Sequence, residues 1–301
     1  MTTAIQRADD ARRPRAREPQ HTELFIGQAN PGLPVKDDQD LMAFPFFSLS
    51  KRPRYDPIEY VDGSGRTIRI EAGPKGMATI WDAELINYAV SLINEALEKG
   101  EPVSNKIRFK VGDFLRFANR GTGGNKHQRF REMLERLNTT RVKTNIERDG
   151  RVLDTAFHLI DSYALAGKRT RNGIEPGQCE IAINEWFFGA MLLERQVLTV
   201  NRAYFKLTSG LARKIYQLAR KHAGANTWEC GLHLLHKKCG ATEPVRNFKG
   251  RLQKLIENDA IPDYLMMIRP AGPHGNGYGH GAMKVVFMKR HTPDEVRRKA
   301  Y

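Results

Sequence analysis

The stretch Leu232–Asp259 reads LHLLHKKCGATEPVRNFKGRLQKLIEND, and it predicts two helices joined by a turn. Its first part, Leu232–Cys239, predicts a short helix that ends at Gly240. Thr242–Pro244 predicts a turn, and the apolar residues of Val245–Asp259 are spaced for a longer amphipathic helix. Two helices joined by a short turn in this way are typical of a helix-turn-helix.

The segments on both sides of this stretch complete a larger pattern. Upstream, Ser209 predicts the cap of a helix that runs to His222, and Thr227–Cys230 predicts a short strand. Downstream, Tyr264–Ile268 and Met283–Met288 predict the two strands of a hairpin. Helix, strand, helix, turn, helix and hairpin is the element order of a winged-helix domain.

The same order is predicted once before in the chain. Asp82–Lys99 has apolar residues at helical spacing, and a strand at Lys106–Lys110 and a helix at Val111–Ala118 follow it. After a glycine-rich turn and another amphipathic helix, Thr140–Glu147 and Leu153–Tyr163 predict the strands of a second hairpin. The duplication is therefore expected in the order of elements.

These patterns predict an α+β protein of two tandem winged-helix domains, each a helix-turn-helix with a β-hairpin wing. The first domain is expected at residues 41–200 and the second at residues 201–291. Residues 1–40 mix Arg, Pro, Asp and Gln with few apolar side chains, so we expect a mostly disordered arm there. Residues 292–301 are expected to form a short C-terminal tail.

Charge is distributed unevenly along the 301 residues, whose net charge is +15. Residues 201–291 contain sixteen Lys and Arg against five Asp and Glu, a local net charge of +11. Such a field attracts polyanions, and nucleic acid is the partner that we expect. A membrane surface is the alternative, but no helix pairs a basic face with an exposed apolar face, and no apolar run approaches the roughly 20 residues of a membrane span.

The cysteines indicate a reducing compartment. Cys179, Cys230 and Cys239 are an odd number in a long chain that shows no apolar leader, which favours a cytoplasmic protein. Cys230, His233, His236 and Cys239 have a regular spacing that raises the question of zinc. Along a helix, ligands at these steps spread over more than about 10 Å, too far for one tetrahedral site. We therefore expect no metal and no cofactor.

The predicted helix Val245–Asp259 has one face suited to reading DNA. On a helical projection, Arg246, Gly250 and Gln253 lie opposite the apolar side chains. Arg can bond guanine and Asn or Gln can bond adenine through two hydrogen bonds each, Lys neutralises phosphates, and Gly lets the helix approach the groove. A solvated basic face is the alternative interpretation. The candidate DNA contacts on this helix are Arg246, Asn247, Lys249, Gly250, Arg251, Gln253 and Lys254.

Other basic residues are candidates for contacts to the DNA backbone. They are Arg213, Lys214, Lys237 and Lys238 in the second domain and Lys126 and Arg129 in the first. The loop Gly121–Lys126 lacks the spacing of a nucleotide-binding P-loop, and the chain has no paired histidines of the kind that a nickase uses. No catalytic residues are predicted, so we expect a protein that is not an enzyme.

Several stretches carry a resemblance when they are taken in order. They are IWDAELINYA at 80–89, NRGTGG at 119–124, LERLNTT at 134–140 and RKIYQLARKH at 213–222, the last leading to Trp228 and to Pro262–Tyr264. Together they resemble the plasmid replication initiator protein A family, over a span from about Leu41 to Arg290. The stretch at 213–222 is the most specific part of the match.

The resemblance implies a bacterial plasmid replication initiator. Such a protein recognises double-stranded origin DNA sequence-specifically, recruits the host replication proteins and performs no catalysis itself. It can also repress its own promoter. In this interpretation the second domain is the main DNA-binding unit, the first adds an auxiliary contact or a homodimer interface, and the protein works in the cytoplasm on the plasmid and nucleoid. The alternative is a winged-helix transcriptional repressor with no replication role.

Overall fold

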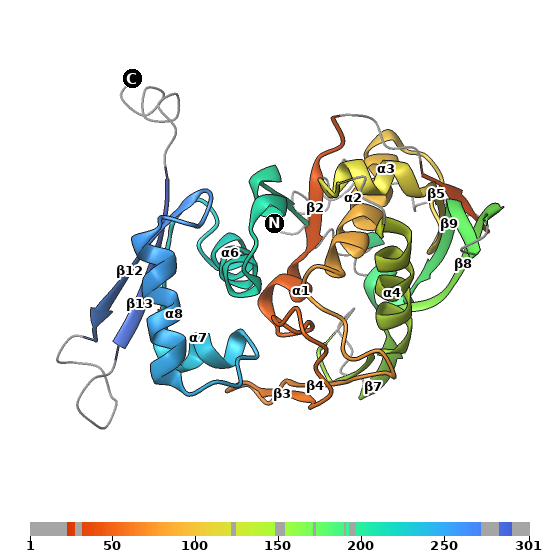
Figure 1. Cartoon of the computed structure of the whole chain (residues 1–301). Coiled ribbons are helices and arrows are strands. Elements are labelled where there is room, and N and C mark those ends of the chain that lie inside the picture. Colours follow the sequence, from red (N-terminus) through yellow and green to blue (C-terminus); the bar gives the residue numbers. More distant parts are fainter. Residues whose placement is uncertain are drawn as a thin grey trace, which may run out of the picture.

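The computed structural model describes residues 23–27, 32–121, 125–147, 154–170, 173–189, 191–192, 197–271 and 283–290 (Figure 1). Within these residues the chain is a mixed α+β fold with several sheets, which confirms the α+β part of the expected fold class. The predicted tail at 292–301 lies outside the described residues, as does the tip of the hairpin between 272 and 282.

Residues up to 200 form the first half of the fold. In chain order its elements are β1 (Phe25–Ile26), β2 (Val35–Asp38), α1 (Gln39–Ala43), β3 (Ile58–Val61), β4 (Thr67–Glu71), α2 (Ala83–Lys99), β5 (Lys106–Lys110), α3 (Val111–Phe117), α4 (Lys126–Thr139), β6 (Arg141–Thr144), β7 (Thr155–His158), β8 (Ile160–Thr170), β9 (Gly173–Ile183), α5 (Glu185–Gly189) and β10 (Val197–Val200).

Residues after 200 form the second half, which contains fewer elements. They are the 3₁₀ helix η2 (Arg202–Lys206), α6 (Gly210–His222), β11 (Thr227–Gly231), α7 (Leu232–Lys238), α8 (Val245–Glu257), β12 (Tyr264–Pro270) and β13 (Met283–Lys289). In Figure 1, α8 and the strands β12 and β13 lie on one side of α6, and α2, α3 and α4 lie on the other.

One arrangement of helices and strands occurs in both halves. In the first half, α2, β5, α3 and α4 precede the hairpin β8–β9, and in the second half α6, β11, α7 and α8 precede the hairpin β12–β13. The sheet orders correspond, because β5-β9-β8 in one half matches β11-β13-β12 in the other. In each case the strand before the helix pair runs antiparallel to the last strand of the hairpin.

The hairpin of the first half differs from the one predicted. The runs Thr140–Glu147 and Leu153–Tyr163 contain β6 and β7, which pair with each other but belong to a separate sheet of order β3-β4-β6-β7. The hairpin that corresponds to β12–β13 is β8–β9, most of which was not predicted. Its residues between Ala164 and Arg169 are largely exposed, so they lack the apolar alternation that marks a half-buried strand.

The predicted arm at residues 1–40 is wrong for its last residues. Val35–Asp38 is a strand that pairs antiparallel with β10, and Leu33 and Val35 are each only 1% exposed. This pairing partner lies about 160 residues away in the chain, so the local composition gave no sign of it. Residues 1–22 lie outside the described residues.

Helix α6 belongs to the second half and packs against α1 of the first half. Leu211, Ile215 and Leu218 are buried in a hydrophobic core that runs continuously through both halves. The helix starts at Gly210, where an added Cβ would lie 2.2 Å from the backbone oxygen of Leu49. Only glycine permits this approach, so the start of α6 lies directly against the backbone of the first half.

The ammonium group of Lys214 fixes α6 to the end of α1. Its Nζ donates hydrogen bonds to the backbone oxygens of Leu41, Met42 and Phe44, at 3.1, 2.9 and 2.6 Å. These are carbonyls at the C-terminal end of a helix, which have no partner within the helix. Burial lowers the pKa of Lys214 to about 7 and raises that of the neighbouring Asp37 to about 7.

We predict that Lys214→Met lowers the free energy of unfolding by about 2–5 kcal/mol, because it leaves buried carbonyls without a donor. Urea denaturation of the full chain measures this value. The matched control is Lys206→Met, at an exposed position of η2, which should change it by less than about 0.5 kcal/mol. Equal effects of the two substitutions would contradict the structural role assigned to Lys214.

Candidate nucleic-acid interface

Helix α8 buries one face and exposes the opposite face. Phe248 and Leu252 are fully buried, and the ring of His236 packs edge-on against Phe248 with its centroid 5.1 Å away. The residues that the sequence placed on the opposite face are accessible: Arg246, Asn247, Arg251, Gln253 and Lys254 are exposed, and Lys249 and Gly250 are half-buried. The apolar spacing of this segment therefore predicts its buried face.

Few of the polar side chains of α8 form hydrogen bonds or ion pairs with the described residues. Arg251 pairs with Glu243 at 2.6 Å. No hydrogen bond or ion pair joins Arg246, Lys249 or Gln253 to another residue in the described part of the chain. An added Cβ at Gly250 would meet no atom within 4 Å, so this glycine leaves a bare stretch of helix backbone at the surface. These features suit contact with a groove and a phosphate backbone.

The two lysines at the end of α7 lie in different environments. Lys237 is exposed. The Nζ of Lys238 lies 5.6 Å from the ring centroid of Phe44 in the first half, and burial lowers the pKa of this lysine. Of the two, only Lys237 has an exposed side chain.

The expectation that Arg213 and Lys214 contact the DNA backbone is wrong, because both side chains are buried at 3% exposure. The guanidinium of Arg213 donates to Glu84 Oε1 at 2.5 Å, and also to the backbone oxygens of Leu207 and Phe205. The residues of α6 from Gly210 to Ala219 are all buried, so its cations serve internal contacts. The most specific stretch of the sequence resemblance is thus an interior one.

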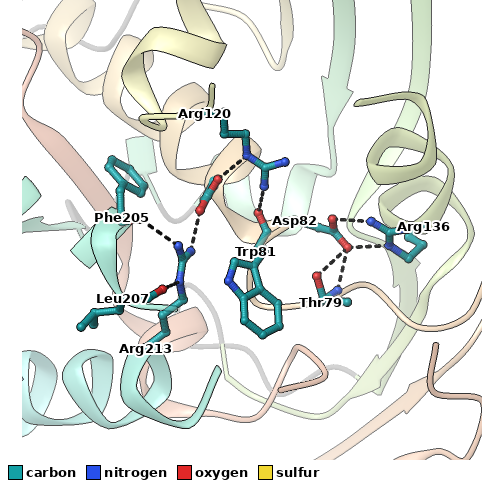
Figure 2. A network of polar contacts seen from close by, with 9 residues as sticks. Thr79, Trp81, Asp82, Arg120, Arg136, Phe205, Leu207 and Arg213 are labelled. Atoms are coloured by element: carbon teal, nitrogen blue, oxygen red, sulfur yellow. Dashed lines mark hydrogen bonds and ion pairs between the residues drawn. The ribbon is translucent and has the colours of Figure 1, made fainter. Parts of the chain in front are cut away.

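A network of buried carboxylates surrounds the start of α2 (Figure 2). Asp82 accepts two hydrogen bonds of 2.7 Å from Arg136 on α4, and it also accepts from the backbone and side chain of Thr79. Glu84 accepts from Arg120 at 2.6 Å as well as from Arg213. The sequence contains these acids in the stretch IWDAEL, but only the structure shows which arginines face them.

The basic residues predicted on α4 lie beside this network. Lys126 is half-buried, Arg129 is exposed, and both line a cleft between α4 and the start of α2. Neither side chain has an ion pair with the described residues. The cleft is also lined by Lys51, Lys75 and Trp81, which the sequence analysis did not single out. These residues lie in loops or at a helix start, where no periodic pattern marks them.

The described residues contain no group of three or more His, Cys, Asp and Glu side chains arranged to hold a metal ion, and this holds for the series from Cys230 to Cys239. The ring of His236 instead bonds the backbone oxygen of Glu243 at 2.7 Å. None of the helices in the described part of the chain combines the length and the apolar composition that a membrane span requires.

Comparisons of the fold with solved structures give two similar chains, both of them RctB domains 2–3. A crystal structure of selenomethionine derivatives of these domains has a TM-score of 0.56 and covers 83% of this chain and 97% of its own. A second crystal structure has a TM-score of 0.54 and covers 86% and 99%. The identity is 14% in both cases, so the likeness concerns the fold alone.

Comparisons of the sequence give a family. A "Putative replication protein" of Wigglesworthia glossinidia brevipalpis is 30% identical over 245 residues, which are 80% of this chain and 88% of that protein. The family model described as "Replication initiator protein A" matches residues 36–266. The resemblance drawn from the sequence is thereby confirmed, and the chain belongs to the replication initiator protein A family.

Proposed function

We propose that this protein initiates plasmid replication by binding double-stranded origin DNA sequence-specifically through the exposed face of α8. The observation that carries the proposal is the combination of Arg246, Asn247 and Gln253 on a helix whose other face is anchored by Phe248 and Leu252. Arg, Asn and Gln are the side chains that read guanine and adenine in the major groove. A helix held by a buried face presents them in a fixed orientation.

In this proposal, each half is a winged-helix unit. The repeated order of elements and the matching sheet orders support it. Helix α8 takes the place of the recognition helix in the second half, and α4 takes that place in the first. The hairpins β12–β13 and β8–β9 are the wings.

The second half provides most of the affinity and the base contacts. Lys249, Arg251, Lys254 and Lys237 contact phosphates near α8, and the bare backbone at Gly250 allows close approach. Lys126 and Arg129 on α4 make an auxiliary contact to a neighbouring stretch of DNA, and Lys238 supports α7 against the first half. The first half also offers a surface for a homodimer.

The remaining parts of the proposal are drawn from the resemblance to the family. The protein recruits host replication proteins to the bound origin in the bacterial cytoplasm, and it performs no catalytic step. Transcriptional repression without replication is the second candidate, because the same α8 surface would bind an operator. A plasmid that carries the gene and a candidate origin, and that cannot otherwise replicate, separates the two. Stable maintenance supports initiation, and tight DNA binding without maintenance supports repression.

We predict that Arg246→Ala or Gln253→Ala reduces the preference for origin DNA over random duplex by about 1–3 kcal/mol, the value of one good contact to a base. Competition binding with both duplexes measures this preference. Both positions are exposed, so the fold should be unaffected. An equal loss on the two duplexes would reassign the residue to phosphate binding.

Lys249→Ala is the contrasting case. It should weaken binding to all duplexes and lower the slope of log K against log salt concentration by about 0.9, the value for one phosphate contact. A titration of binding over a series of salt concentrations gives the slope. An unchanged slope would remove Lys249 from the interface.

We predict that the purified protein neither nicks supercoiled origin DNA nor hydrolyses ATP. Any strand opening should then come from binding, whose contacts offset a deformation cost of about 1–6 kcal/mol. The assay follows strand breaks and permanganate-reactive thymines with and without Mg²⁺. Distortion without breaks is the expected result. A Mg²⁺-dependent nick that is lost on mutation of one Tyr, Asp or His would show an enzyme.

A further inference from the structure

A cleft of about 1190 Å³ opens beside the network of Figure 2, between α4, the start of α2 and the segment that leads into α6. Seven basic side chains and three acidic ones line it, a net charge of +4. The basic residues are Lys51, Lys75, Arg120, Lys126, Arg129, Arg136 and Arg213, and the acidic residues are Asp82, Glu84 and Glu132.

The basic side chains of the cleft that are not held by carboxylates are mostly exposed to solvent. Arg120, Arg136 and Arg213 are held by the buried carboxylates of Asp82 and Glu84. The other four cations, Lys51, Lys75, Lys126 and Arg129, have no hydrogen bond or ion pair with the described residues. Three of these four are exposed. The cleft therefore presents cations that are free to meet an anion.

An aromatic ring lies among these charges. Trp81 is half-buried and lines the cleft, with the Nζ of Lys51 over its ring at 5.3 Å and the guanidinium of Arg213 at 5.7 Å. Lys51 is exposed and long, so it can move from the ring to a phosphate while a flat group takes its place. An aromatic ring in a positively charged groove is the combination that binds single-stranded nucleic acid.

We propose that this cleft binds a short segment of single-stranded nucleic acid, with one base on Trp81 and phosphates on Lys51 and Lys75. The size favours a single strand over a duplex. Drug-sized ligands fill pockets of roughly 300–1,000 Å³, so this volume admits a few nucleotides. Stacking on Trp81 also needs a base whose face is not covered by its neighbours, which a single strand offers and an intact duplex does not. The site is separate from α8, and the inference does not depend on α8 being the duplex contact.

The test measures binding of a fluorescein-labelled decamer of deoxythymidine to the full-length protein by fluorescence anisotropy. The double variant Lys51→Ala/Lys75→Ala should lower the salt slope by about 1.4, since each phosphate contact contributes about 0.7 on a single strand. Trp81→Leu should weaken binding by about 5- to 100-fold, and Trp81→Phe should retain most of it because a ring still stacks.

The matched control is Lys249→Ala/Lys254→Ala on α8. It should leave decamer binding unchanged and weaken binding to duplex DNA. Lys51→Ala/Lys75→Ala should weaken decamer binding and leave duplex binding unchanged. This crossed design separates a failure of the cleft proposal from a failure of the duplex proposal. Loss of decamer binding through the α8 variant alone, absence of decamer binding by the wild-type protein, or displacement of the decamer by an equal nucleotide concentration of dTMP would overturn the proposal.

Discussion

The carboxylate of Glu84 accepts hydrogen bonds from two arginines that come from the two halves of the chain. Arg120 follows α3 in the first half, Arg213 lies on α6 in the second, and Glu84 is only 2% exposed. Away from water, removal of one partner leaves a buried charge, at a cost of about 3–5 kcal/mol. The three groups therefore permit few arrangements of α2, α3 and α6, and the orientation of the two halves depends on them.

Helix α6 makes further polar contacts with the first half. Lys214 donates to the end of α1, and Gln217 donates to Asp37 at 2.9 Å. Tyr216 on α6 packs against Tyr264 at the start of β12, with 6.2 Å between the ring centroids, and β12 contacts α8. Helix α8 lies on the far side of α6 from α4 (Figure 1). Two surfaces proposed to meet nucleic acid are thus held at a set spacing. In the proposed function, such a rigid connection would let the protein impose a bend on the DNA that it binds.

The sequence was a good guide where periodicity and local pattern decide the structure. The apolar spacing at Val245–Asp259 predicted which face of α8 is buried, and the helix pairs of both halves were found at their predicted positions. The sequence was a poor guide where a residue's hydrogen-bond partner or a strand's pairing partner lies far away in the chain. Lys214 and Arg213 were predicted to be surface cations because the carbonyls of α1 and the carboxylate of Glu84, which accept from them, lie more than 120 positions away. Strand β2 was missed for the same reason, since β10 completes it.

The two halves should keep one fixed orientation in solution, and the distance between α4 and α8 tests this. The native cysteines, Cys179, Cys230 and Cys239, are buried, so spin labels would attach to cysteines introduced at Gln128 and Lys254, two exposed positions on these helices. Pulsed electron paramagnetic resonance on the free protein should give a single narrow distance distribution. A broad or two-component distribution would show that the halves move independently and that the contacts of Glu84 do not fix their orientation.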